Sequence, residues 1–109
     1  MIFPGNIDID KIYTTAFMCG YESQSRQLIE EMAKLTQAIN KKWKEDSGII
    51  TYNKDHIRAI TEEMAGVIVC LEQVQILLNI PDEKIENIID RKLIREERRA
   101  EALATKGDK

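Results

Sequence analysis

Apolar residues recur every three or four positions along two long stretches of the chain, which predicts amphipathic helices. The clearer stretch runs from about 54 to 78, and its stripe is Ile57, Ile60, Met64, Val67, Leu71, Val74 and Leu78. Such a pattern, sustained over three heptads, is typical of a helix that packs against other helices. Because further apolar residues widen this face, we expect the helix to be buried on more than one side.

The preceding stretch, 22–44, carries a second stripe made of Leu28, Met32, Leu35, Ile39 and Trp43. A shorter helix is predicted over 8–18, because Asp8 or Asn6 can cap its start and Gly20 can end it. Residues 45–53 contain Ser47-Gly48 and are predicted to form a loop.

A fourth helix begins after Pro81, where Asp82 and Glu83 suit a helix N-terminus. It continues through a basic run whose residues alternate with glutamates, so much of it is expected to be solvated: Arg91, Lys92, Arg95, Arg98 and Arg99. The pattern as a whole predicts an all-α bundle of about four helices. We expect an irregular arm at 1–7, the helical domain at 8–103 and a disordered tail at 104–109.

Composition narrows the classes of function. The 109 residues are 43% hydrophobic and 32% charged, with a net charge of -3, which indicates one soluble domain and argues against nucleic-acid binding. No apolar run approaches the roughly 18 residues of a membrane span, so we expect a cytoplasmic protein that does not bind membranes. Cys19 and Cys70 are expected to be free buried thiols. His56, the only histidine, is expected to be solvated or to cap a helix.

A short repeat carries the candidate chemistry. The Glu-Glu-Met-Ala segment at 30–33 recurs at 62–65, inside the two long predicted helices. At about 100° per residue, Glu31 and Glu63 lie on equivalent flanks of their apolar stripes. Two carboxylates brought together at a partly dry seam repel each other and lose hydration, and a bridging cation removes both penalties. The repeat therefore predicts a cation site.

Magnesium suits such oxygen ligands and leaves room for a substrate phosphate. Glu30 and Glu62 point towards solvent and are secondary candidate ligands. A residue three positions further along a helix could also reach the ion, but these positions hold Lys34 and Gly66, which cannot coordinate it. The alternative is that Glu pairs recur by chance on Glu/Lys-rich helices.

The repeat and its surroundings resemble the MazG-like family of all-α nucleoside triphosphate pyrophosphohydrolases. The family's EExxE motif corresponds to 30–34, and its ExxD motif corresponds to 63–66. The matching surroundings are 26–29, 35–39, Val67, 71–73, 92–95 and Arg98. The resemblance covers roughly residues 20–99 and implies a dimeric or tetrameric bundle that binds a nucleotide with magnesium. Of the four acids, this chain keeps Glu31 and Glu63.

We therefore expect a MazG-like nucleotide-binding protein with weak or absent hydrolysis, in which the Lys34 ammonium takes the place of the metal and the ligand is sensed or sequestered. The residues expected to contact phosphate are Lys34, Lys92, Arg95, Gln27 and Arg26, and the candidates for stacking on a base are Tyr21 and Trp43. One alternative is an active magnesium-dependent enzyme that yields a nucleoside monophosphate and pyrophosphate. The other is a helical protein-interaction module. In each case we expect a homodimer or homotetramer.

Overall fold

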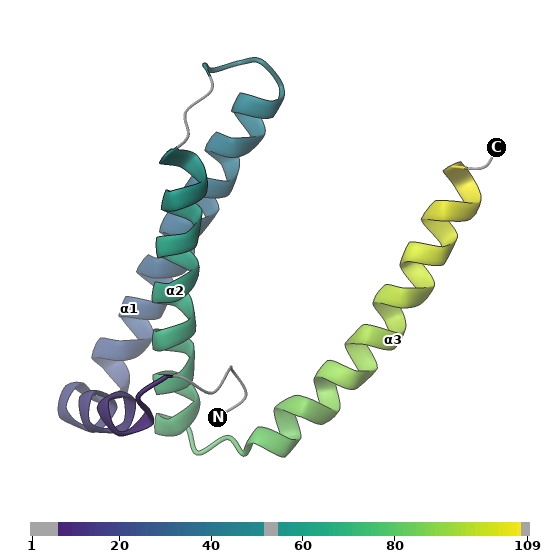
Figure 1. Ribbon diagram of the computed structural model, residues 1–109. Helices are drawn as coiled ribbons and strands as arrows, with labels where there is room; N and C mark the ends of the chain where they lie inside the picture. The colour runs from purple at the N-terminus through teal and green to yellow at the C-terminus, as the bar shows by residue number, and fades with distance from the viewer. Residues whose placement is uncertain (1–6, 52–54, 108–109) are drawn as a thin grey trace. The chain divides into compact units, whose positions relative to one another are not determined.

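The computed structural model describes residues 7–51 and 55–107, and within these ranges the chain forms three α-helices and no strand (Figure 1). The helices are α1 (Ile9–Asp46), α2 (Asp55–Leu77) and α3 (Asp82–Gly107). The all-α class is confirmed. The described residues form three helices where about four were expected, because the two predicted helices 8–18 and 22–44 adjoin within α1. Gly20, whose backbone is not helical, separates the two segments as predicted.

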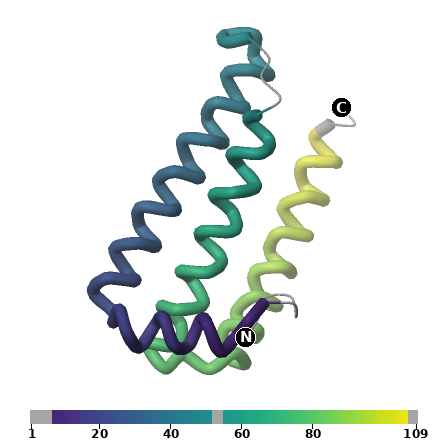
Figure 2. The backbone as a smooth tube through the Cα atoms, turned by 60° about the vertical axis from the view of Figure 1, so that its left-hand side comes forward, coloured from purple at the N-terminus to yellow at the C-terminus, as the bar shows by residue number. Residues whose placement is uncertain are grey.

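The bend in α1 depends on glycine. Gly20 has φ 83° and ψ 170°, a backbone conformation that side-chain-bearing residues rarely adopt. Before the bend, α1 is capped by Asp8, whose Oδ1 accepts a hydrogen bond from the Lys11 backbone N–H at 3.2 Å. Figure 2 shows the first part of α1 crossing the C-terminal end of α2, while the rest of α1 runs antiparallel beside α2.

The interior of this hairpin is small and half polar. Its buried apolar residues are Ile12, Ala16, Leu28, Ala38 and Cys70. Its buried polar residues are Gln24, Glu72, Gln73 and Gln75, and the first of these donates a hydrogen bond from Nε2 to Oε1 of Gln73 at 2.6 Å. Because buried polar groups need partners, this bond between α1 and α2 helps to define how the two helices align.

Much of the predicted apolar core lies on the surface instead. On α2, the side chains of Ile57, Met64, Leu71 and Leu78 are between 38% and 57% exposed. On α1, Met32, Ile39 and Trp43 are between 41% and 67% exposed. Within a single chain these parts of the stripes are therefore uncovered, and their burial in a homodimer stays a prediction. Both stripes lie on helices, as predicted, but Leu28 is the one stripe residue that is fully buried in the hairpin.

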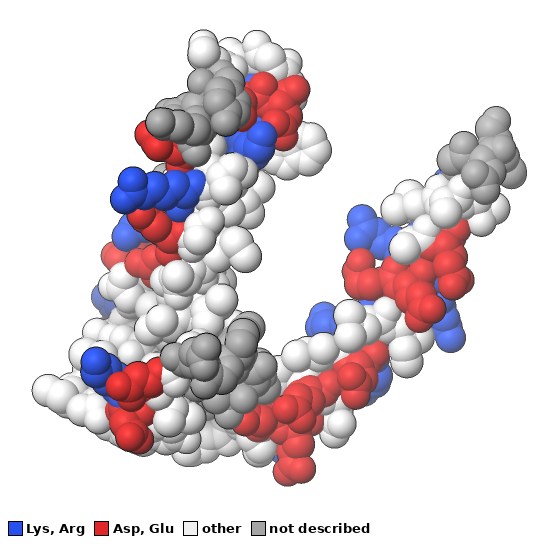
Figure 3. Space-filling model, viewed as in Figure 1, with Lys and Arg blue, Asp and Glu red and all other residues white. Residues whose placement is uncertain are grey.

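The two exposed stripes share one face of the hairpin. Each helix can be viewed along its axis from its N-terminus. In this view, both stripes lie about 100° around the helix, in the same rotational sense, from the side that contacts the other helix. Since α1 and α2 are antiparallel, equal turns in the same sense bring both stripes to the same side. We call this surface the apolar face and define it by Met32, Ile39, Trp43, Ile57, Met64 and Leu71. Uncharged side chains cover a long band of the hairpin in Figure 3.

Residues from Ile80 onwards form a second compact unit that contains α3. Asp82 and Glu83 occupy the first turn of the helix, as expected. The helix extends to Gly107, so residues 104–107, which were expected to be a disordered tail, are helical. The expected irregular arm at 1–7 lies almost entirely outside the described residues.

Breaking the buried glutamine pair should destabilise the hairpin. Gln73→Met leaves the amide of Gln24 without its partner, and an unsatisfied buried polar group costs about 1–3 kcal/mol. Gln73→Met combined with Gln24→Met removes both polar groups and should cost less than the single change. Urea denaturation of the wild type, the two single variants and the double variant measures the differences in free energy of unfolding. A double variant that loses the sum of the two single losses would contradict this explanation.

Candidate functional site

The repeat brings Glu31 of α1 and Glu63 of α2 together where the two helices meet, with their carboxyl groups close enough to influence each other. Glu31 also accepts a hydrogen bond at Oε1 from Nε2 of Gln27 at 3.0 Å. The Lys34 ammonium lies 3.4 Å from the same oxygen. The side chain of Glu31 is 14% exposed, whereas that of Lys34 is 54% exposed. Lys34 therefore reaches from the surface to a largely buried acid.

Two opposing effects act on the pKa of Glu31. Burial alone raises the pKa, because it penalises the charged carboxylate. The hydrogen bond from Gln27, the positive charge of Lys34 and the hydrogen bond from Lys34 lower it, with a smaller contribution from the nearby Glu63 side chain, and together they outweigh the burial. The pKa of Glu31 therefore lies below its ordinary value, and the group is a carboxylate at neutral pH. It provides a fixed negative charge beside the Lys34 ammonium.

Gly66 is needed for this arrangement. A Cβ atom at position 66 would lie 2.9 Å from Cδ of Glu31 and still closer to its carboxylate oxygen. The carboxylate of Glu31 thus occupies the space that a side chain at 66 would fill. From the sequence alone, Gly66 is a position that cannot provide a metal ligand. In the structure the glycine also makes room for Glu31 against α2.

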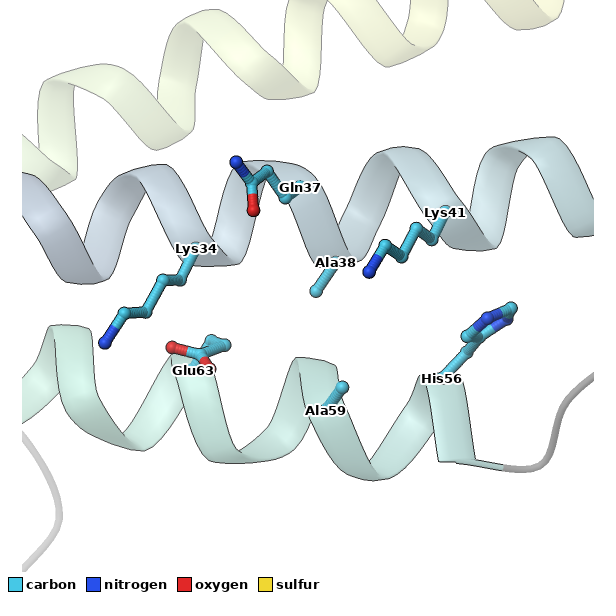
Figure 4. Close-up of a pocket in the computed structure, with 7 residues that line it drawn as sticks. All are labelled: Lys34, Gln37, Ala38, Lys41, His56, Ala59 and Glu63. Carbon is cyan, nitrogen blue, oxygen red and sulfur yellow. The ribbon is translucent and has the colours of Figure 1, made fainter.

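A pocket of about 160 Å³ opens beside the acid pair, between α1 and α2 (Figure 4). It is lined by Lys34, Gln37, Ala38, Lys41, His56, Ala59 and Glu63. The small side chains of Ala38 and Ala59 leave space between the helices, and the Lys34 and Lys41 side chains extend along it (Figure 4). On α1, these lysines lie about 180° from the exposed stripe, so the pocket and the apolar face use opposite sides of that helix.

His56 lies at the end of this pocket and belongs to a chain of polar contacts. Its Nδ1 lies 2.5 Å from Oε2 of Glu45, and Glu45 is also 3.1 Å from the Lys42 ammonium. Lys42 in turn lies 2.6 Å from Asp46. Hydrogen bonds to Asp46 and then to Glu45 raise the pKa of Lys42 above its ordinary value. The expectation of a solvated or capping histidine is wrong, because the side chain of His56 is 13% exposed and held by Glu45.

Sequence reasoning missed Lys41, His56 and Gln37 as pocket residues. Lys41 carries a usable signal, because it lies seven positions after Lys34 and so on the same side of the helix. His56 carries no such signal. Its contact with Glu45 depends on how the chain turns between α1 and α2.

The other predicted site residues lie elsewhere. Glu30 and Glu62 are exposed, and Glu62 pairs with Arg58 at 3.2 Å. Arg26 pairs with Glu22 at 3.1 Å on the surface. The candidate aromatic residues are both exposed and are not part of the pocket lining: Tyr21 and Trp43. The basic candidates on α3 belong to the second unit: Lys92 and Arg95.

The positions of the acidic, histidine and cysteine side chains test whether the described residues form a metal site. Within 7–51 and 55–107, no group of three or more His, Cys, Asp or Glu side chains is placed to hold a metal ion. Magnesium binding therefore stays a prediction.

Cys70 is buried, as expected, and burial together with the nearby Glu31 charge raises the pKa of its thiol. Cys19 is exposed, which corrects the expectation for that residue.

Comparisons with known proteins add no relative. No protein-family model, no curated protein and no solved structure matches the chain. The MazG-like resemblance therefore depends on the motif residues and their spacing. As to membranes, none of the helices in the described part of the chain has the length and apolar character needed to cross one.

Proposed function

We propose that the hairpin binds the phosphate groups of a nucleotide or nucleotide-derived ligand, with weak or absent hydrolysis. The observation that carries this proposal is the Lys34 ammonium, 3.4 Å from Glu31 and in one pocket with Glu63. The MazG-like resemblance places a magnesium ion among these acids. Here a lysine side chain supplies the positive charge from within the chain.

Lys34 and Lys41 would contact the ligand directly. An ammonium group donates strong, charge-assisted hydrogen bonds to phosphate oxygens without a metal. Hydrolysis by a metal-bound water needs an ion that lowers the pKa of that water. Lys34 and Gly66 provide no ligand for such an ion, so the proposed role is binding, as in a nucleotide sensor or a protein that sequesters its ligand.

The pocket is too small for a whole nucleotide. At about 160 Å³ it falls below the roughly 300–1,000 Å³ of typical small-molecule sites. It therefore suits the phosphate end of the ligand, while the base and sugar need groups beyond this pocket. By the MazG-like resemblance, basic residues of the kind found on α3, such as Lys92 and Arg95, or a neighbouring subunit would supply such groups.

Thermal stability measured against a panel of nucleotides, with magnesium and with EDTA, tests this function. A ligand that binds only the folded state adds about 2.7 kcal/mol at a hundredfold excess over its Kd. We expect a rise in Tm that survives EDTA, with no pyrophosphate released. Stabilisation that requires magnesium and is accompanied by pyrophosphate release would instead support the enzyme. No effect from any nucleotide would support the interaction module.

We also propose that the chain is a homodimer in which the apolar face of each hairpin covers that of the other. Contiguous exposed apolar surface usually marks an interface, and six large side chains form this face. A two-fold dimer buries the same surface on both copies, which a continuous apolar face allows. The small, half-polar interior supports the proposal, because chains of this size need extensive apolar burial to be stable.

A further inference from the structure

A groove along one side of α3 is lined by positive charge. It has a volume of about 580 Å³, and all of its lining residues belong to this helix and are exposed: Ile88, Arg91, Ile94, Arg95 and Arg98. At about 100° per residue, the basic residues of α3 share an arc of about 120°, and its acidic residues lie on the opposite side. Acidic side chains cover much of the side of α3 that Figure 3 shows. The groove therefore presents positive charge with no acid beside it among the described residues.

The three arginines of this groove are not neutralised by their own helix. On a helix, a side chain can pair with residues three or four positions away. For Arg91 and Arg95, every residue at these distances is uncharged or basic. For Arg98, one of them is acidic, namely Glu101. Within 7–51 and 55–107, none of the three guanidinium groups takes part in an ion pair, so all three are available to a partner.

The groove follows a heptad register. Four of its lining residues are spaced three, four and three positions apart and form one seam along the helix: Ile88, Arg91, Arg95 and Arg98. Like charges placed together across an interface are unfavourable, so three successive arginines on a seam oppose pairing of α3 with its own copy. The seam instead suits a different helix that carries acids at the facing positions.

We propose that this groove binds an acidic amphipathic helix of another protein. Each guanidinium group can bind a carboxylate through two parallel hydrogen bonds, and arginine clusters recognise acidic motifs in this way. Ile88 and Ile94 lie on either side of the arginines and are 45% and 50% exposed. They would contact apolar side chains that flank the acids of the partner helix.

Other anionic partners fit this groove less well. Nucleic acid is a polyanion, which the net charge of -3 repels at long range. None of the described residues that line the groove is aromatic, so a base has no ring on which to stack. A helix that lies on a membrane buries an apolar face, whereas arginines occupy the middle of this one. An acidic amphipathic helix supplies both the few carboxylates and the apolar contacts that the groove can use.

Binding of synthetic helical peptides to the full chain tests this proposal. The probe is a labelled peptide of about three heptads, with glutamate at three successive seam positions and leucine on both sides of them. Its twin carries lysine at the same three positions. By fluorescence anisotropy, the glutamate peptide should bind at least about tenfold more tightly than the lysine peptide, because the arginines attract one and repel the other.

Reversing the charge of the groove should reverse this preference. Arg91→Glu with Arg98→Glu leaves Arg95, a candidate for nucleotide binding, in place and should make the lysine peptide the tighter ligand. The matched control is Arg99→Glu with Lys106→Glu, which changes the net charge equally on the same helix but outside the groove. This control should keep the wild-type preference. Tighter binding of the lysine peptide cannot result from unfolding, and circular dichroism would check that both variants stay helical.

Each other outcome overturns the proposal. Equal affinities for the two peptides, or no binding of the glutamate peptide, would show that the groove does not select acids. A loss of preference as large in the control as in the groove variant would indicate an effect of net charge alone. Single-stranded RNA or phosphatidylserine vesicles that bind more tightly than the glutamate peptide, and depend on Arg91 and Arg98, would indicate a nucleic-acid or membrane surface instead.

Discussion

Replacing Met64 with aspartate should convert the protein from a dimer to a monomer. Met64 is 50% exposed and lies in the middle of the apolar face. In the proposed dimer this change would bury an unpaired carboxylate on each copy, which costs more than about 3 kcal/mol. Because each 1.4 kcal/mol is about tenfold in affinity, the Kd of the dimer should rise more than about a hundredfold.

Ala65→Asp is the matched control for this change. Ala65 is exposed on the same turn of α2 but lies outside the apolar face, so its carboxylate should stay in water. Light scattering coupled to size-exclusion chromatography would give the mass of each protein over a range of concentrations. A wild-type protein that is monomeric throughout, or a Met64→Asp variant as dimeric as the Ala65→Asp variant, would refute the proposed interface.

Removing the Lys34 ammonium should abolish most of the metal-independent affinity for a nucleotide. A hydrogen bond to a charged group contributes about 1.5–3 kcal/mol, so Lys34→Ala should weaken binding by about ten- to a hundredfold. Calorimetric titration in EDTA measures this loss with any nucleotide that raises the Tm. Lys44→Ala is the control, because Lys44 lies on the same helix but outside the pocket.

The reverse substitutions sharpen this test. Lys34→Glu with Gly66→Asp restores the four acids of the MazG-like motif, and the new side chain at 66 displaces Glu31 from its present place. We expect nucleotide binding by this double variant to require magnesium. Affinity that is unchanged in Lys34→Ala would show that the lysine does not replace the metal, whatever the double variant does.

The helices follow closely from the sequence, but their packing does not. The heptad stripe predicts a helix over 54–78, and α2 occupies Asp55–Leu77. Gly20 was expected to end a helix, and its non-helical backbone does interrupt α1, although a second helical segment follows at once. Periodicity identifies which side chains share a face, and it does not identify what covers that face. Gln24 and Gln73 illustrate this, because two amides become suitable interior residues only when they meet each other.

In the candidate site, too, positions along a helix are predictable and contacts between helices are not. Matching helical phase predicts that Glu31 and Glu63 share a seam, and the structure places them close together. The close packing of Glu31 against Gly66 depends on the distance between the helix axes, which no local pattern encodes. The contact of His56 with Glu45 depends on the connection between the helices. The side of its own helix on which a residue lies can be predicted from the sequence. A contact that depends on how two helices are positioned is much harder to predict.

Because the interior of the hairpin is small, the stability of the folded state would depend on the concentration of the protein. If the apolar face is covered only in the dimer, dilution exposes it and weakens the folded state by mass action. Obligate dimers of this kind often have no stable folded monomer. The cell could then adjust the supply of binding sites through synthesis and degradation alone, because chains below a threshold concentration would unfold and be removed by proteases.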